Sequence, residues 1–337
     1  MKLLAGTSTG VFAIGNAHDT TPVLPERSVR DLASSAGRLL AAADTGLFAS
    51  EDGGRTWHPS GVEGRVVWKI FIGPRAGEVY VGTQPAGVFR SKDDGRTWEE
   101  IESFTRAPEA ERWCVPVKPR QPGRARALVI DRRDPQRMWV GVEVGGVVST
   151  TDGGGTWRLD LPGGVPDIHM MEAHPAKPSV LFASTGYGRI DGVAEKVDGN
   201  AGVFRSDDDG ATWVYAWRGV SPRYARPMCI DPRPPHGLTV ASAPTAFSTV
   251  KDEGGAQAML FRSEDCGETW RSLGDRAHSP SAANFHGLIP DATSLGGVLV
   301  GTETGEVWQV SDGGEWTKLA SGLPSVLSIL ALGQCST

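Results

Sequence analysis

Short apolar runs alternate with polar turns along the whole chain, and one eight-residue pattern returns between them. The pattern, S/T-x-D-x-G-x-T-W, follows an apolar run and precedes a stretch of alternating apolar and polar residues. Complete copies, here called octets, occupy residues 50–57, 91–98, 150–157, 206–213 and 263–270, and a shortened copy occupies 311–316. An apolar run, a turn and a second strand predict a β-hairpin at each octet. A motif that returns every 41 to 59 residues predicts a repeat architecture.

Each residue type in the octet has a structural task in a tight turn. The aspartate carboxylate can accept hydrogen bonds from backbone N–H groups further along the turn. Glycine supplies the positive φ that residues with a Cβ resist. Threonine begins the outgoing strand, and tryptophan buries its ring between neighbouring units. We therefore predict structural roles, not catalytic or calcium-binding ones, for the six aspartates: Asp52, Asp93, Asp152, Asp208, Asp265 and Asp312.

The octet resembles the Asp-box, or BNR repeat, which is found in sialidases, sortilin-type receptors, photosystem II assembly factors and many bacterial propellers. Five complete copies and one shortened copy spread the resemblance over essentially the whole chain. It implies a β-propeller, in which four-stranded blades surround a central axis. It implies little about chemistry, because function resides in sites that differ among proteins of one fold.

The hairpins predict a single all-β domain, a seven-bladed β-propeller that spans residues 1–337. The first hairpin lacks both an octet and an inner strand, while an apolar stretch at 325–332 is left over at the end of the chain. We expect these two to pair, so that the C-terminal strand closes the ring in the N-terminal blade and removes exposed strand edges. The predicted blades are 1–27 with 325–332, 28–61, 62–104, 125–162, 165–218, 225–275 and 284–320.

Composition and charge narrow the class of protein. The 337 residues carry a net charge of −6 and a pI near 5.7, which argues against nucleic-acid binding. Cys114, Cys229, Cys266 and Cys335 have no C-x-x-C spacing, so neither a zinc site nor a disulfide framework is expected. No apolar run is long enough for a signal-peptide core or a membrane span. We expect a cytoplasmic protein without membrane contact, although a mature form that had lost a signal peptide would look the same.

Three long insertions are predicted to lie on one face of the disc. In an up-down-up-down blade, the octet turn and the turn between the first two strands share one face, and the other connections share the opposite face. Residues 102–124, 185–200 and 243–257 all belong to the second set. Long loops without regular structure in a compact domain are usually functional or disordered. We therefore expect a functional site at the axial mouth on the face opposite the octets.

The residues that begin the inner strands, and the insertions beside them, supply candidates for this axial site. The predicted catalytic residues are His169, His286 and Tyr224, and the predicted substrate-binding residues are Arg112, Arg226, Trp68, Trp113, Arg189 and Tyr187. Arginines concentrated around one mouth of an acidic protein favour a small polar or anionic ligand, because guanidinium groups bind carboxylates through two hydrogen bonds.

Each candidate also has a structural alternative. The two histidines are about as consistent with hydrogen-bonded structural residues as with an acid, a base or a ligand. The arginines could be solvated or paired with a nearby acid (Glu109, Glu111 or Asp167), and the tryptophans could be packing residues. No cofactor is predicted. A metal ion at the axial mouth stays open, because the two histidines lack a clear carboxylate partner.

Two main classes of function follow from these residues. The first is an enzyme, a hydrolase or lyase that acts on a small carboxylate, glycoside or lactone, with a histidine as acid or base and arginines on the anion. The second is a non-enzymatic binding or assembly scaffold, as the resemblance to photosystem II assembly factors implies. Glycan binding is a third alternative.

The resemblance to sialidases has a more specific implication. It implies an arginine triad (Arg112, Arg226 and Arg189 or Arg223) and a tyrosine nucleophile (Tyr224 or Tyr187). No acid is placed clearly beside either tyrosine, and the Arg-Ile-Pro motif of sialidases is absent. Sialidase activity itself is therefore not expected.

Overall fold

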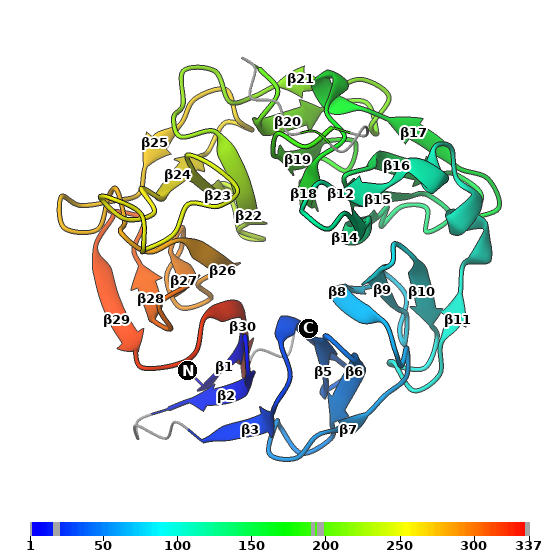
Figure 1. The fold of residues 1–337 in the computed structure, drawn as a ribbon, viewed down its shortest axis with the longest axis horizontal. Coiled ribbons are helices and arrows are strands. Elements are labelled where there is room, and N and C mark those ends of the chain that lie inside the picture. Colours follow the sequence, from blue (N-terminus) through cyan, green and yellow to red (C-terminus); the bar gives the residue numbers. More distant parts are fainter. Residues whose placement is uncertain (1, 16–20, 190–192, 194–198, 334–337) are drawn as a thin grey trace.

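Seven four-stranded antiparallel sheets surround a common axis in the computed structural model, which describes residues 2–15, 21–189, 193 and 199–333 (Figure 1). From the axis outward, blade 1 contains β30 (Val326–Leu332), β1 (Lys2–Thr7), β2 (Gly10–Ile14) and β3 (Pro22–Pro25). Blade 2 contains β4 (Val29–Ser35), β5 (Arg38–Ala43), β6 (Gly46–Ser50) and β7 (His58–Pro59), and blade 3 contains β8 (Val66–Ile72), β9 (Val79–Gln84), β10 (Val88–Ser91) and β11 (Glu99–Glu100). The predicted seven-bladed β-propeller is confirmed.

Blades 4 to 7 repeat this order. Blade 4 contains β14 (Arg124–Ile130), β15 (Met138–Glu143), β16 (Gly146–Thr150) and β17 (Arg158–Asp160), and blade 5 contains β18 (Ile168–Ala173), β19 (Leu181–Thr185), β20 (Gly202–Ser206) and β21 (Val214–Tyr215). Blade 6 contains β22 (Tyr224–Ile230), β23 (Leu238–Ala243), β24 (Met259–Ser263) and β25 (Arg271–Ser272), and blade 7 contains β26 (Phe285–Pro290), β27 (Val298–Thr302), β28 (Val307–Val310) and β29 (Trp316–Ala320). The connections hold a ribbon of β12 (Cys114–Val115) and β13 (Gln121–Pro122) and the 3-10 helices η1 (Glu102–Arg106), η2 (Ala110–Arg112) and η3 (Pro162–Gly164).

The two ends of the chain meet in blade 1. β30 pairs antiparallel with β1, with Leu332 opposite Lys2 and Val326 opposite Thr7. The apolar side chains of Val326 and Ile329 are buried, so the closing strand also contributes to the core. The C-terminal strand therefore pairs with the N-terminal blade, as the sequence predicts, and it covers the inner edge of β1.

In the five complete octets the aspartate is bonded to its own turn. Asp52 Oδ1 accepts the N–H groups of Arg55 and Thr56 at 2.9 and 3.0 Å, and Oδ2 accepts the Thr56 hydroxyl at 2.7 Å. The Ser50 hydroxyl donates to Asp52 and accepts the N–H of Gly54, whose φ of 86° suits glycine. Equivalent contacts of the serine or threonine, the glycine and the second threonine recur around Asp93, Asp152, Asp208 and Asp265.

The shortened copy at 311–316 uses its aspartate differently. Asp312 Oδ1 lies 2.5 Å from Arg271 and 3.1 Å from Arg262, both in the preceding blade. Within its own turn, the Ser311 hydroxyl accepts the N–H of Glu315 at 3.0 Å. Asp312 thus joins two blades, because the shortened turn lacks the threonine whose N–H and hydroxyl bind the aspartate in the complete octets.

The octet tryptophans contact the preceding blade. Trp98 Nε1 donates to the carbonyl of Ser60, and Trp270 Nε1 donates to the carbonyl of Ala216, both at 2.7 Å. The Trp270 ring also packs edge-on against Trp217, with ring centroids 4.5 Å apart. These contacts place apolar rings between adjacent sheets, where the hydrophobic core of the propeller lies.

Further capped turns, which the octet pattern does not contain, join the first two strands of several blades. Asp131 Oδ1 accepts the N–H of Arg133 at 2.8 Å, and Asp231 and Asp291 make the equivalent contact in blades 6 and 7. In blade 5 the ring nitrogen Nδ1 of His174 takes this place and accepts two backbone N–H groups at 3.1 Å. The octet face of the disc therefore has two series of turns in which a side chain accepts hydrogen bonds from backbone N–H groups of the same turn.

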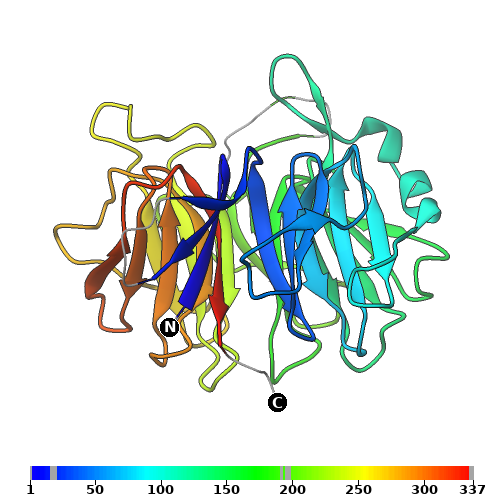
Figure 2. The same ribbon diagram turned by 90° about the horizontal axis from the view of Figure 1, so that it is seen from below.

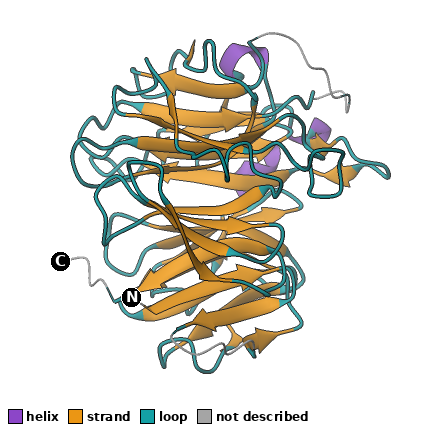
Figure 3. Cartoon of the chain, turned by 90° about the vertical axis from the view of Figure 1, so that its left-hand side faces the viewer, coloured by secondary structure: helices purple, strands orange, loops and turns teal. Residues whose placement is uncertain are grey.

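Strands run between the two faces of the disc, and loops occupy the faces (Figure 3). In the described part of the chain no helix is long and apolar enough to cross a membrane. Cys114, Cys229 and Cys266 are free thiols, and Cys335 lies outside the described residues.

Candidate functional site

Every inner strand carries a β-bulge near its beginning. In β4, Val29 and Asp31 pair with consecutive residues of β5, so that Arg30 is the extra residue. The same irregularity falls at Trp68 in β8, Arg126 in β14, His169 in β18, Arg226–Pro227 in β22, His286 in β26 and Leu327 in β30. A bulge interrupts the alternation of faces and re-aims a side chain, and bulges are frequent next to active sites. All of these extra residues line one cavity on the axis.

The axial cavity has a volume of about 270 Å³ and carries a surplus of positive charge. Five cationic side chains line it (Arg30, Lys69, Arg124, Arg126 and Arg226), against two carboxylates, Asp31 and Glu143. Lys69 Nζ lies 3.2 Å from Asp31, and Arg126 and Arg124 lie 2.5 and 3.4 Å from Glu143. Arg30 and Arg226 form no ion pair with any residue that the structure describes.

Arg30 and Arg226 also have a guanidinium nitrogen without a hydrogen bond to any described residue, namely the buried Nε atom of each. Arg226 Nη2 donates to the carbonyl of Ala246 at 2.8 Å, and its guanidinium lies 5.1 Å from the centre of the Tyr224 ring. Both guanidinium groups line the cavity without an acidic partner among the described residues, so they are suited to an anionic ligand.

Trp68 holds three guanidinium groups over its ring. Arg30, Arg124 and Arg126 lie 4.2, 4.4 and 5.3 Å from the ring centre. Cation–π attraction offsets part of the repulsion between these like charges. The indole Nε1 of Trp68 donates to Gln84 at 3.3 Å, which fixes the ring from outside the stack.

Burial and neighbouring positive charges lower the pKa values of some basic groups of the cavity, Arg30, Arg124 and His286 among them. Burial, together with the charges of Arg124 and Arg126, lowers the pKa of Arg30 to about 10. Burial and the charge of Arg226 lower the pKa of His286 to about 4, so this imidazole is neutral at neutral pH. No described residue forms a hydrogen bond with the ring of His286. The cavity wall thus presents a neutral imidazole without a hydrogen-bond partner.

His169, by contrast, has close partners at both ring nitrogens. Nδ1 lies 2.5 Å from the carbonyl of Ala225, and because a carbonyl only accepts, Nδ1 carries a proton. Nε2 lies 3.1 Å from both the Tyr224 hydroxyl and Asp167 Oδ1. Burial raises the pKa of Tyr224, so its hydroxyl keeps its proton at neutral pH. These contacts fix the orientation of the His169 ring in the wall.

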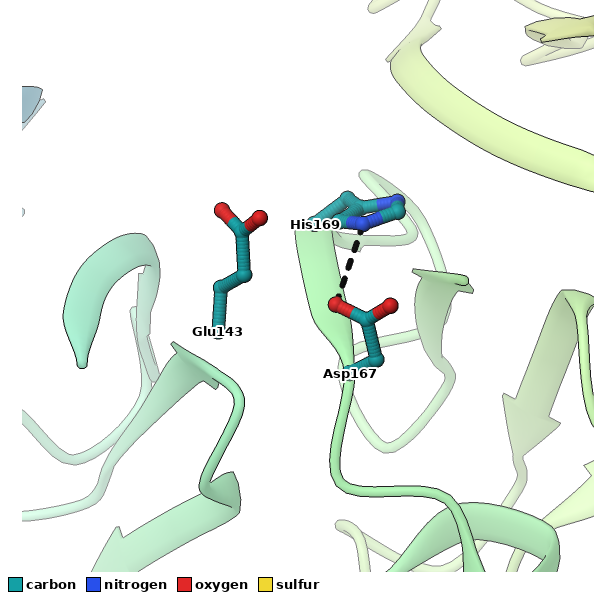
Figure 4. A group of neighbouring side chains, drawn as sticks. All are labelled: Glu143, Asp167 and His169. Atoms are coloured by element: carbon teal, nitrogen blue, oxygen red, sulfur yellow. Dashed lines mark ion pairs between the residues drawn. The ribbon is translucent and has the colours of Figure 1, made fainter. Parts of the chain in front are cut away.

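Glu143 approaches the same histidine from the neighbouring blade. Burial opposes the charged form, but Arg126 and Arg124 hold the pKa of the Glu143 carboxyl well below its usual range. One ligand atom each of Glu143, Asp167 and His169 lie within 4.8 Å of one another. Figure 4 shows the two carboxylates on different sides of the imidazole ring.

The structure brings four of the predicted site residues together, because Trp68, His169, Arg226 and His286 all line the axial cavity. The two tyrosines do not line it. Tyr224 and Tyr187 are buried behind the wall, with ring centroids 5.3 Å apart, and the Tyr187 hydroxyl donates to a backbone carbonyl. The two tyrosines therefore support the cavity wall from behind.

The remaining three predicted residues also lie outside the cavity lining. Arg112, on η2, is half exposed and pairs with Glu109. Trp113 is buried in the core, where its ring lies 5.1 Å from that of Phe104. Arg189 is exposed in the 185–200 insertion. Pairing with a nearby acid was the structural alternative for Arg112, and packing was the alternative for Trp113. The structure shows both arrangements.

Several cavity residues were not predicted from the sequence: Arg30, Asp31, Lys69, Arg126 and Glu143. Arg30 and Arg126 occupy the same bulge position as the predicted Trp68 and His169. That shared position, one or two residues into each inner strand, is the signal that would have found them. Glu143 carries no such signal, because it ends a second strand, β15.

Two of the three insertions lie on one face of the disc. Figure 2 shows the described segments of 102–124 and 243–257 rising from the same face of the disc. Of the insertion 185–200, residues 190–192 and 194–198 lie outside the described part of the chain. The 243–257 insertion is attached to the neighbouring blade, because Glu303 accepts the N–H of Val250 at 2.7 Å and the hydroxyl of Thr249 at 2.8 Å.

No protein-family model matches this chain, and no curated protein matches it. Solved structures match it in fold. A GH74 enzyme from Niastella koreensis is 15% identical with a TM-score of 0.63, and the match covers 94% of this chain and 46% of that chain. An ancestral GH74 enzyme is 12% identical with a TM-score of 0.59, over 86% of this chain and 37% of that chain.

A third structure, YCF48 from Cyanidioschyzon merolae, is 15% identical with a TM-score of 0.58, and the match covers 88% of this chain and 87% of that chain. The chain therefore spans less than half the length of the two GH74 chains and most of the length of YCF48. At these identities the likeness shows the propeller fold alone.

Proposed function

We propose that the axial cavity binds a small anionic molecule, for which a carboxylate is the best fit, and that His286 exchanges a proton with it. The surplus of cationic side chains around the cavity carries this proposal. Arg30 and Arg226 reach the cavity from blades 2 and 6 without an acidic partner among the described residues, so an anion between them gains charge-assisted hydrogen bonds. It also relieves the repulsion from Arg124 and Arg126, which adds to burial in lowering the pKa of Arg30.

The chemistry expected at this site is that of a hydrolase or lyase. His286 is neutral at neutral pH and free to accept a proton. A base beside a guanidinium-bound carboxylate removes a proton from the adjacent carbon, as in a lyase, or from water, as in a hydrolase. The arginines stabilise the negative charge that develops on the substrate. In this scheme His169 and Tyr224, which are hydrogen-bonded to each other, support the cavity wall and do not transfer a proton to or from the substrate.

The anion site can be tested by calorimetry with glucuronate and sulfate as probes and glucose as the neutral control. The native protein should bind both anions with one site per chain and should not bind glucose. Arg30→Gln should weaken anion binding at least about tenfold, because a charge-assisted hydrogen bond is lost. Arg112→Gln is the matched control, since Arg112 is a cation on the same face outside the cavity. Equal affinity of the two variants would refute the proposed site.

A screen for turnover separates the enzyme from a binding protein. Glycosides, lactones and oligosaccharides of uronic acids should be incubated with the native protein and with His286→Gln. A lyase releases a conjugated alkene that absorbs in the ultraviolet, and a hydrolase releases a reducing end or an acid. Product formation that persists in His286→Gln would exclude the proton-transfer role of that residue.

A second candidate function is a non-enzymatic binding or assembly module. Phe247 is 76% exposed and Val250 is 42% exposed on the 243–257 insertion, and exposed apolar groups beside a functional face often contact a partner. The likeness to YCF48 is compatible with this class at the level of the fold. If no substrate is turned over, and if Phe247→Ser abolishes capture of a protein partner that the native chain retains, the assembly function replaces the enzymatic one.

A further inference from the structure

Three metal-ligating side chains meet in the wall of the axial cavity. Glu143 ends β15, Asp167 precedes β18 directly, and His169 is the bulge residue of β18. One ligand atom from each lies within 4.8 Å of the other two, and Figure 4 shows Asp167 next to the imidazole ring and Glu143 on another side of it. The three groups come from two neighbouring blades, so the ring of sheets sets their separation.

Asp167 has one carboxylate oxygen without a hydrogen bond. Oδ2 accepts the N–H of Gly188 at 2.8 Å. Oδ1 is buried and accepts no hydrogen bond from any described residue, although it lies 3.1 Å from His169 Nε2. The close approach is therefore one of distance without hydrogen-bond direction. Asp167 is only 4% exposed, and a buried carboxylate oxygen without a partner is costly unless a cation satisfies it.

The hydrogen bonding of His169 leaves Nε2 as the atom for a cation. Nδ1 carries the proton that is donated to Ala225, as described above. Histidines that bind metals usually donate their other ring N–H to a carbonyl or carboxylate in this way, which fixes the tautomer. Nε2 then keeps its lone pair, to which the Tyr224 hydroxyl donates at 3.1 Å, while Asp167 Oδ1 lies at the same distance. A cation at Nε2 would take over that contact.

The arginines around Glu143 leave part of its carboxylate available. Arg126 Nη1 lies 2.5 Å from Oε2, whereas Oε1 has a longer contact of 3.5 Å with Arg124. The two carboxylates supply two negative charges for a divalent cation, and the neutral imidazole adds a nitrogen donor. An anion bound in the cavity would then lie between the cation and the arginines and would be attracted by both.

We propose that Glu143, Asp167 and His169 bind one divalent transition-metal cation, whose open coordination positions face the axial cavity. Two oxygen ligands and one imidazole suit Mn²⁺, Fe²⁺ or Zn²⁺ better than Ca²⁺ or Mg²⁺, which prefer oxygen ligands alone. Three protein ligands with open positions are typical of catalytic sites rather than structural ones. The role of the cation in holding the anion rests on the proposed function, but its binding to the three residues does not.

The test uses the full chain after dialysis against EDTA, with Mn²⁺ as the probe because Mn²⁺ has little affinity for the free thiols. Calorimetry and electron paramagnetic resonance should show one bound Mn²⁺ per chain. Asp167→Asn and Glu143→Gln should each weaken binding at least about tenfold. His286→Gln is the matched control, since His286 lines the same cavity outside the cluster, and it should bind Mn²⁺ as the native protein does.

Two results would overturn the metal site: no Mn²⁺ or Zn²⁺ binding at millimolar concentrations, or unchanged Mn²⁺ affinity in Asp167→Asn and Glu143→Gln. Circular dichroism establishes that each variant is folded, and if Asp167→Asn does not fold, Glu143→Gln alone decides. Sulfate affinity measured with and without Mn²⁺ separates the two proposals. If Mn²⁺ binds at the three residues while sulfate binds nowhere in the cavity, the metal site stands and the anion site fails.

Discussion

The octet turns and the axial mouth both consist largely of charged and polar side chains, but the partners of those side chains lie at very different distances along the chain. In each complete octet, the aspartate finds its partners within four residues. At the mouth, Glu143 pairs with arginines 17 and 19 residues away, and Arg30 and Arg226 find no acid among the described residues. Charges satisfied locally stabilise a fold, and charges left unsatisfied after folding mark a site for a ligand.

The largest expected effects come from replacing one tryptophan in each region, Trp270 in an octet and Trp68 at the axial mouth. Trp270→Ala removes the ring that packs against Trp217 and donates to Ala216, so it should lower the free energy of unfolding by about 3 kcal/mol. Its affinity for sulfate should not change. Trp68→Ala should do the reverse, with affinity reduced about tenfold and little loss of stability, because Trp68 stacks on cavity arginines.

Urea unfolding and calorimetry of both tryptophan variants check this contrast. If Trp270→Ala weakened sulfate binding as much as Trp68→Ala, the two regions would be coupled, and the division between stability and binding would be wrong.

Arg226→Gln should reduce sulfate affinity about a hundredfold, equivalent to about 2.7 kcal/mol, because Arg226 carries a buried charge without an acidic partner. Stability should change by less than about 1 kcal/mol, since the cost of burying that charge disappears with it. Arg205→Gln is the control on the octet side. Arg205 pairs with Asp207 and Glu268 at the surface, so its loss should leave sulfate binding unchanged.

The fold could be predicted because its determinants are local in the sequence. Turn chemistry such as that of Ser50, Asp52 and Gly54 recurs in a fixed order, and each octet reports one hairpin. The unpaired strand at the C-terminus and the missing one at the N-terminus then required ring closure. Asp312 is the exception, since only the structure shows that it joins two blades.

The site could be predicted only in part, because the pairing register of the inner strands decides which residues fall in the bulges and line the cavity. Trp68, His169, Arg226 and His286 were found from their place near the start of inner strands, which is where the bulges fall. Arg30 has the same place but no motif around it. Glu143 enters the cavity from the end of a second strand, and no sequence pattern reports which loop ends reach the axis.

His286 should make anion binding depend on pH. Its pKa is lowered to about 4 by burial and by Arg226, and a bound anion offsets that positive charge and raises the pKa toward the ordinary value. Anion binding is then coupled to proton uptake, so sulfate affinity should rise about tenfold between about pH 7.5 and about pH 5.5. In His286→Gln, sulfate affinity should no longer change with pH over this range. A pH dependence that remains in that variant would assign the proton to another group.

The smallest expected effect lies on the octet face. Burial of Asp265 opposes its charged form, but hydrogen bonds from Thr269 and Ser263 outweigh it and lower the pKa of the carboxyl. A carboxyl whose pKa is lower in the folded than in the unfolded protein contributes stability above the unfolded pKa and loses it as the pH falls through the folded one. Asp265→Asn should therefore cost about 1 kcal/mol at neutral pH, and the difference from the native protein should shrink below about pH 4. Sulfate affinity should be unaffected at any pH, because every hydrogen bond of this carboxylate is made within its own turn.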